Sequence, residues 1–217
     1  MQLVLSAISA GGLVGAGNQY LCLLIVSAAA KMDLISLTPQ MGFMESWWFI
    51  GIVAAFWLLT IAPAYASLLS PGVMNAINTT VNFISGFAVP VSAALLSLAS
   101  IGIIVEMNPD LRNVLRTMQL FDPEGGIGTT GFLVAGGSAL TATVLTGSKF
   151  LAKPAVSTAT GTTGTVSAPI YATLENLASI ILMALLFVLT QINPWLLVGL
   201  LALVTLLILG VLAYAIY

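Results

Sequence analysis

The chain has 217 residues, of which 59% are hydrophobic and 6% charged; it carries a net charge of −2, one cysteine and no histidine. Soluble domains contain about 25% charged residues, so this composition excludes a water-facing globular surface. The negative net charge excludes the basic footprint of a nucleic-acid-binding protein, and the cysteine and histidine counts exclude a disulfide framework and argue against a metal site. We therefore expect an all-α integral membrane protein with a single transmembrane domain over residues 1–217.

Long charge-free runs mark the predicted membrane-spanning segments. Residues 46–105 and 176–217 carry no charge at all. Because a spanning helix needs about 20 mostly apolar residues, the first run is long enough for two helices and the second for most of two more. The six predicted spans are residues 3–30, 47–69, 78–105, 129–150, 169–191 and 194–217.

An even number of spans would place both chain ends on the same side of the membrane. Positively charged loop residues normally mark the cytoplasmic side. Here the count assigns no side, because the predicted topology sets three positive residues against two: Lys31, Arg112 and Arg116 on one side, and Lys149 and Lys153 on the other.

The first predicted span is rich in glycine near its centre. Gly11 and Gly15 form a small-xxx-small pair, which lets a second helix approach closely. A ligand site at these glycines is the alternative interpretation. Asn18 follows them inside the apolar run, and in either case its side chain needs a hydrogen-bond partner within the bundle. Asn18 is therefore a candidate polar site residue.

The well-charged stretch between the third and fourth spans predicts an amphipathic helix over residues 109–121. Leu111, Val114, Leu115 and Met118 recur at helical spacing. The helix either lies in the plane of the membrane surface or is a solvated connector between two spans.

The most informative polar residue is Glu175, which lies about two turns inside the fifth span. A carboxylate at that depth is costly, and it normally faces a partner or a water-filled cavity. Residues 155–168, a neutral Ser/Thr/Gly segment, are predicted to form a loop before this span. If this loop folds back into the bundle, Lys149 and Lys153 at the end of the fourth span can reach Glu175 and form a structural ion pair. The alternative is that Glu175 belongs to a substrate or ion site. The other candidate residues are Asn176, Lys149, Lys153, Thr162 and Thr163.

Residues that would support an enzyme are missing from the pattern. Gly126-x-Gly128-x-x-Gly131 matches the dinucleotide-binding fingerprint, but no predicted strand precedes it, so we interpret it as the flexible start of a helix. The chain shows no Ser/His, paired-Asp or metal-binding constellation. We therefore expect a protein that is not an enzyme and has no catalytic residues.

Two segments separated by 79 positions resemble each other. Residues 90–101 and 169–180 share Pro, Ala, Leu, Leu, Ala, Ser and Ile in register. This offset pairs the second span with the fourth and predicts a duplicated two-helix unit. A weaker match between residues 13–17 and 133–137 would instead pair the first span with the fourth, and the two three-helix halves would then be inverted.

Residues 147–157 and 169–175 resemble the second half of the bacterial domain of unknown function 4126 family, and residues 15–24 and 81–96 resemble its first half. The resemblance implies a small multi-span protein of the bacterial inner (plasma) membrane without an established activity. Residues 61–67 depart from the pattern, because they lack the charges we expect the family to carry there. This departure argues against a charge-based transport mechanism.

Two functional hypotheses remain. In the first, the chain is a non-enzymatic structural or accessory subunit, which packs its Gly-rich faces against other membrane subunits or a second copy, with membrane lipid or an apolar cofactor as a further ligand. In the second, it is a small-solute or ion transporter or channel with a site around Glu175.

Overall fold

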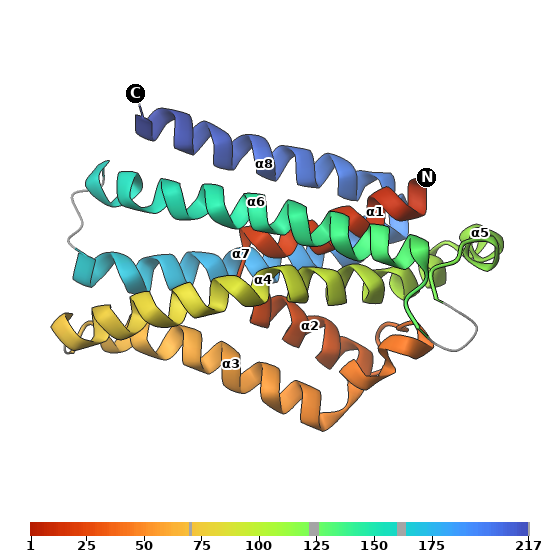
Figure 1. The fold of residues 1–217 in the computed structure, drawn as a ribbon, viewed down its shortest axis with the longest axis horizontal. Coiled ribbons are helices and arrows are strands. Elements are labelled where there is room, and N and C mark those ends of the chain that lie inside the picture. Colours follow the sequence, from red (N-terminus) through yellow and green to blue (C-terminus); the bar gives the residue numbers. More distant parts are fainter. Residues whose placement is uncertain (70, 122–125, 160–163, 217) are drawn as a thin grey trace.

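The computed structural model describes residues 1–69, 71–121, 126–159 and 164–216. Within these ranges it describes the side chains outside positions 71–76, 78, 109, 112, 115–116, 152–159, 164–166 and 215–216. The elements of these residues are α-helices and 3₁₀ turns, and the long helices run along one common axis, which confirms the all-α prediction (Figure 1).

Five of the described helices are long and apolar enough to cross a membrane. Helices that follow one another along the chain run in opposite directions (Figure 1). Their surfaces away from the core carry exposed large apolar side chains, which suit contact with lipid rather than water. The chain is therefore an all-α integral membrane protein. The five helices are α3 (Trp47–Ala66), α4 (Pro71–Met107), α6 (Thr129–Ala159), α7 (Gly164–Ile192) and α8 (Trp195–Ile216).

The structure corrects the single helix predicted over residues 3–30. This segment consists of two short helices with a 3₁₀ turn between them. The break has a local cause. Gly17 adopts an extended conformation, and the side chain of Asn18 accepts hydrogen bonds from the backbone N–H groups of Tyr20 and Leu21, so it caps a new helix instead of continuing the old one. The elements are α1 (Gln2–Gly12), the 3₁₀ turn η1 (Leu13–Ala16) and α2 (Gln19–Lys31).

The two short helices form a re-entrant hairpin, because the chain enters and leaves the bundle at the same end (Figure 1). At the start of α1, Gln2 lies 3.4 Å from Asn193, which joins α7 to α8. At the end of α2, the ammonium of Lys31 lies 5.7 Å from the ring centre of Trp47, at the start of α3. We call α1, η1 and α2 the helical hairpin, and residues 15–18 the hairpin tip.

The helical hairpin changes the topology. Because it does not cross the bundle, the described residues contain five helices able to span a membrane instead of the six predicted, and the start of α1 and the end of α8 lie at opposite ends of the bundle (Figure 1). This arrangement differs from the predicted one, in which an even number of spans brings both chain ends to one side of the membrane.

The segment predicted as a loop over residues 155–168 is also largely helical. Helix α6 continues past Pro154 to Ala159, and α7 begins at Gly164, before Pro169. Hydroxyl side chains are compatible with such helices when they bond within the helix. Thr143 and Thr173 do this by donating to the carbonyl groups four residues earlier, each at 2.7–2.8 Å.

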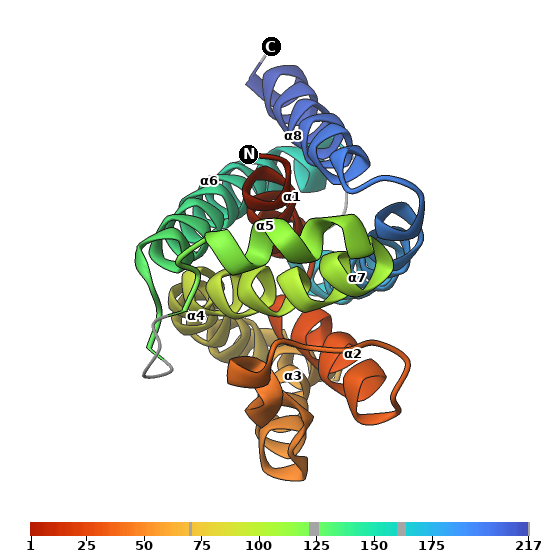
Figure 2. The ribbon, with the colours of Figure 1, turned by 90° about the vertical axis from the view of Figure 1, so that its right-hand side faces the viewer.

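The charged stretch predicted as a helix over residues 109–121 forms a 3₁₀ turn, η3 (Pro109–Leu111), and a shorter helix, α5 (Arg112–Thr117). Figure 2 shows α5 lying across the end of the bundle, which is the orientation an interfacial helix would have. The helix ends early because Met118 is extended, and the next residues pair with the start of α6: the backbone N–H of Thr130 donates to the Gln119 carbonyl at 3.1 Å.

Glycines at the centre of the bundle confirm the predicted tight helix crossing. A methyl group added at Gly11 would lie 2.7 Å from the Ser97 Cβ of α4 and 2.8 Å from the Ser138 Cβ of α6. One at Gly15 would lie 2.8 Å from the Ala142 Cα of α6. Such contacts leave no room for a side chain, so α1 and η1 pack with their backbones directly against α4 and α6.

At the end of the bundle near Trp47, hydrogen bonds to Glu106 and a close backbone contact at Gly102 hold the connection after α2 against α4. The carboxylate of Glu106 accepts hydrogen bonds from the Ser36 backbone N–H at 2.7 Å and the Ser36 hydroxyl at 2.8 Å. The backbone of residues 36–38 crosses α4 at Gly102, where a Cβ would meet it at 2.7 Å. The 3₁₀ turn η2 (Pro39–Glu45) then leads into α3.

Helix directions distinguish the two predicted repeats. The 79-residue offset pairs α3 with α6 and α4 with α7, and each pair runs in the same direction (Figure 1). An inverted repeat would require α1 and α6 to run in opposite directions. They run in the same direction, because Ser138 contacts Ile8 and, further along both helices, Thr146 contacts Gly15. The arrangement of helices therefore agrees with duplication of a two-helix unit.

Candidate functional site

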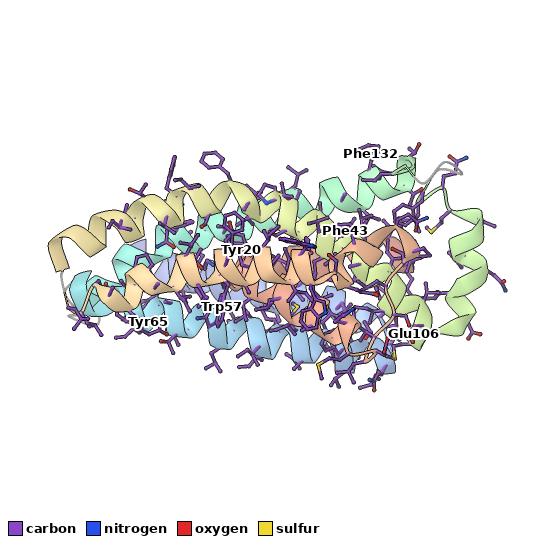
Figure 3. The ribbon with its side chains drawn as sticks, turned by 90° about the horizontal axis from the view of Figure 1, so that it is seen from below. Tyr20, Phe43, Trp57, Tyr65, Glu106 and Phe132 are labelled. Atoms are coloured by element: carbon purple, nitrogen blue, oxygen red, sulfur yellow. The ribbon has the colours of Figure 1, made fainter. Side chains whose placement is uncertain are left out.

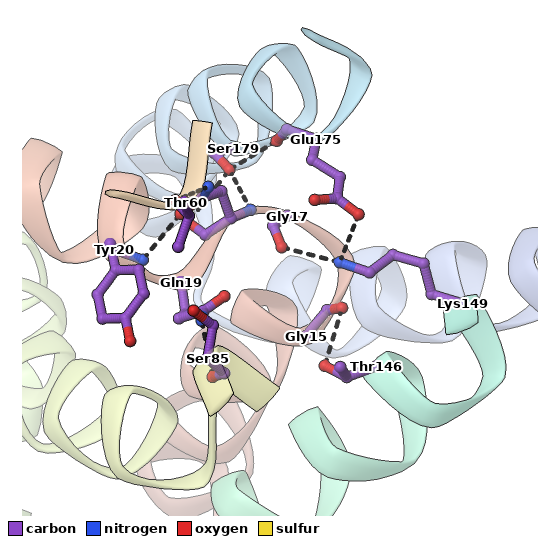
Figure 4. A network of polar contacts seen from close by, with 11 residues as sticks. Gly15, Gly17, Gln19, Tyr20, Thr60, Ser85, Thr146, Lys149, Glu175 and Ser179 are labelled. Carbon is purple, nitrogen blue, oxygen red and sulfur yellow. Dashed lines mark hydrogen bonds and ion pairs between the residues drawn. The ribbon is translucent and has the colours of Figure 1, made fainter. Parts of the chain in front are cut away.

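The hairpin tip lies near the middle of the bundle, and its unwound backbone has carbonyl groups that make no hydrogen bond within the helical hairpin. Two of its carbonyl groups accept hydrogen bonds from α6: Gly15 O from the Thr146 hydroxyl at 3.2 Å, and Gly17 O from the Lys149 ammonium at 3.0 Å (Figure 4). Within a bilayer, unwound backbone persists only where protein or a polar cavity satisfies it. Helix α6 provides that satisfaction at the tip.

Asn18 joins the hairpin tip to two further helices. Its backbone N–H donates to the Ser179 hydroxyl of α7 at 2.6 Å, and its side-chain amide donates to the Thr60 hydroxyl of α3 at 3.3 Å (Figure 4). Its side-chain oxygen caps α2. The predicted need of Asn18 for a partner inside the bundle is therefore confirmed, and the start of α2 has no free N–H left for an anion at the positions that Asn18 caps.

Lys149 and Glu175 form an ion pair beside the hairpin tip. The Lys149 ammonium lies 3.4 Å from Glu175 Oε1, and the side chains are 18% and 19% exposed. The ammonium therefore bridges a carboxylate of α7 and the Gly17 carbonyl of the hairpin (Figure 4). This is the pairing that the sequence predicted as one of two alternatives. Glu175 also lines a cavity, so the second alternative, a solute site, remains open.

The other predicted site residues do not join this cluster in the described part of the chain. Asn176 accepts a hydrogen bond from the Trp57 indole N–H of α3 at 3.2 Å, and so connects α7 to α3 outside the cavity lining. Figure 3 shows Trp57 and Tyr65 on the α3 side that meets α7, where Tyr65 also contacts Thr173 at 2.9 Å. The Lys153 side chain and the predicted residues Thr162 and Thr163 lie outside the described residues.

A cavity of about 860 Å³, which we call the groove, lies between α3, α4, α6 and α7 and ends at the hairpin tip. Asn18, Thr60 and Glu175 form its polar end. Tyr171 and Ser167 of α7 continue its floor away from the tip. The groove occupies the half of the bundle that is far from Glu106, whereas the other half is filled by packed apolar side chains.

Aromatic side chains and glycines border the groove between α4 and α6. Phe83 and Phe87 of α4 line it and are each 69% exposed, and Phe150 of α6 lines it and is 40% exposed. Gly86 and Gly147 also line it, and a Cβ added at either would meet nothing within 4 Å. The groove therefore opens to the surface between α4 and α6, within the stretches of both helices that can span a membrane.

Sequence reasoning missed several groove residues. Thr60 and Gly86 stood in apolar runs with nothing to distinguish them from packing residues. The prolines Pro63 and Pro90 were visible signals of helix irregularity in α3 and α4, and Pro90 does line the groove.

The glycine motif at residues 126–131 has a packing explanation. A Cβ at Gly128 would lie 2.9 Å from the Gln119 carbonyl carbon, and one at Gly131 would lie 2.8 Å from the Ile127 side chain. These two glycines let the backbone of residues 119–120 pack against the start of α6. The motif therefore lies at the start of a helix, as predicted.

Comparison with protein-family models, curated proteins and solved structures gives no match. The resemblance to the domain of unknown function 4126 family therefore stays a prediction, and function has to be argued from the groove and the hairpin tip.

Proposed function

We propose that the chain is a membrane transporter for a small solute that has a zwitterionic polar end and an apolar body. The observation that carries the proposal is the groove, which ends at a broken helix and an ion pair. Discontinuous helices with polar groups near the middle of the membrane are typical of solute sites in transporters. A charged residue within a span is costly to bury, so Glu175 is a candidate functional residue.

The chemistry of the groove supports this solute class. Glu175 lines the polar end of the groove, and the Lys149 ammonium lies beside its carboxylate, 3.4 Å from Oε1, without lining the groove itself. If the Lys149 side chain turns towards the groove when a solute binds, a zwitterion can pair with both charges, so that neither is left without a partner. A solute with a single charge would leave one member of the pair without a partner. The phenyl rings of Phe83, Phe87 and Phe150 provide an apolar wall for the rest of the solute.

Flux into proteoliposomes tests the proposal. Radiolabelled leucine and phenylalanine represent the proposed class, with glycerol and Rb⁺ as an uncharged and a cationic probe. The wild-type chain should accelerate uptake of an amphipathic zwitterion at least about tenfold over empty liposomes, because the spontaneous crossing of such a charged molecule is slow. Gly86→Trp, whose side chain projects into the open groove, should abolish this uptake.

Gly136→Trp is the matched control. Gly136 also lies where an added Cβ meets nothing within 4 Å, but it does not line the groove. It should therefore leave uptake unchanged. The proposal is overturned if no zwitterionic probe moves faster than in empty liposomes, or if both tryptophan variants reduce flux equally.

The accessory-subunit hypothesis predicts a different outcome. A mild-detergent pull-down from the native membrane, which the resemblance implies is the bacterial inner membrane, would recover stoichiometric membrane partners, and the purified chain alone would show no flux. Recovery of the chain alone or as a homo-oligomer, together with flux, favours the transporter.

A further inference from the structure

Two negative features meet at the hairpin tip. The first is the carbonyl end of α1 and η1, which carries the negative pole of the helix dipole and ends at the Gly17 carbonyl. The second is the Glu175 carboxylate, which α7 brings to the same place. Oxygen atoms from an unwound helix end and from a carboxylate are together the donor set that hard monovalent cations bind in membrane transporters.

In this chain the shared position is filled by a side chain. The Lys149 ammonium lies 3.0 Å from Gly17 O and 3.4 Å from Glu175 Oε1. Lys149 comes from a third element, α6, and Thr146 of the same helix is bonded to Gly15 O, so the adjacent carbonyl is held in place as well. The Lys149 ammonium therefore lies between a carbonyl and a carboxylate oxygen, where a free cation would bind, but it is covalently part of the chain.

We propose that the hairpin tip is a monovalent-cation site whose resident cation is the Lys149 ammonium, and that a sodium-sized ion can bind there when this side chain is removed. The groove reaches Thr146 and Glu175, so water can complete the coordination of such an ion. The consequence for transport rests on the proposed function: solute movement in the wild-type chain needs no inorganic cation, because the required positive charge is already part of the chain.

Thermal unfolding in detergent tests the cation site without any knowledge of the solute. The Tm of Lys149→Ala should be about 3–6 °C higher in 300 mM NaCl than in 300 mM N-methylglucamine chloride. This shift is expected if the Kd of sodium for the folded protein is roughly one-tenth of the sodium concentration used. The wild-type chain and Lys31→Ala should show no such difference. Lys31 is the matched control, because its ammonium lies over Trp47 at the other end of α2 and away from the groove.

Lys149→Ala/Glu175→Gln should lose the sodium effect, since one of the two oxygen groups is then neutral. If Lys149→Ala does not purify as a folded protein, Lys149→Gln gives the same comparison. The proposal is overturned if the Tm of the lysine variant is the same in sodium, potassium, lithium and N-methylglucamine chloride. Absence of flux in proteoliposomes would refute the proposed function and leave this result unchanged.

Discussion

Removing both members of the Lys149–Glu175 pair should destabilise the protein less than the sum of the two single removals. Exposed ion pairs contribute about 0–1 kcal/mol, whereas breaking a fully buried pair costs about 3–5 kcal/mol. Each side chain here is roughly one-fifth exposed (18% and 19%). We therefore expect Lys149→Met or Glu175→Gln alone to cost about 2–3 kcal/mol, or about 4–12 °C in Tm for a chain of this size.

The double variant Lys149→Met/Glu175→Gln should be less destabilised than the sum of the two single changes, because no charge is left without a partner. The coupling should be about 1–2 kcal/mol, as is typical for residues in direct contact. Thermal unfolding of the four proteins in one detergent measures it. Lys31→Met serves as the control; since Lys31 is exposed and lies over Trp47, it should cost less than about 1 kcal/mol. Additive single effects would refute the argument that the two charges stabilise each other.

Two further predictions follow from packing and topology. Gly15→Ala should lower the free energy of unfolding by about 1–3 kcal/mol, because its methyl group would meet the Ala142 backbone. Gly136→Ala should leave it unchanged or raise it by up to about 1 kcal/mol, because its methyl group meets nothing within 4 Å. Equal Tm values for the two variants would contradict this packing. Reporter fusions should place the first residue of this chain in the cytoplasm and its last residue outside. The end of α2 and helix α5, which carry Lys31, Arg112 and Arg116, lie at the end of the bundle where α1 begins, whereas the opposite end has only Lys153, near the end of α6, because Lys149 is paired within the bundle. Reporters on the same side would disprove the five-span topology.

The long spans could be predicted from the sequence because charge-free runs leave few alternatives in a membrane. The helical hairpin could not, because residues 3–30 have the length and apolarity of a single span, and hydropathy does not distinguish one crossing from two half-crossings. The sequence did contain a signal in Gly17 and Asn18, since an extended glycine followed by a capping asparagine starts a new helix. We interpreted the glycine-rich stretch as a helix crossing, with a ligand site as the alternative, and the crossing accounts for Gly11 and Gly15 but not for the break at Gly17.

The candidate site was predicted in part. Glu175 and Lys149 were found because charges inside a span are costly and need partners. Asn176 was included on sequence proximity alone, yet adjacent helical residues point about 100° apart, so it faces Trp57 and not the groove. Thr60 and the open face at Gly86 depend on how α3 and α4 pack against other helices, which no local pattern specifies.

The claim that the groove is a solute pathway requires that water-soluble molecules reach its floor. Ala172 lies on that floor, and Ile180 lies on the same helix with 53% exposure outside the groove. In a Cys22→Ala background, which removes the chain's one cysteine, Ala172→Cys and Ile180→Cys can be treated with a membrane-impermeant thiol reagent from each side of the membrane. The account predicts rapid labelling of Ala172→Cys from one side only and little labelling of Ile180→Cys. If Ala172→Cys reacts as slowly as Ile180→Cys from both sides, the groove is not a solute pathway.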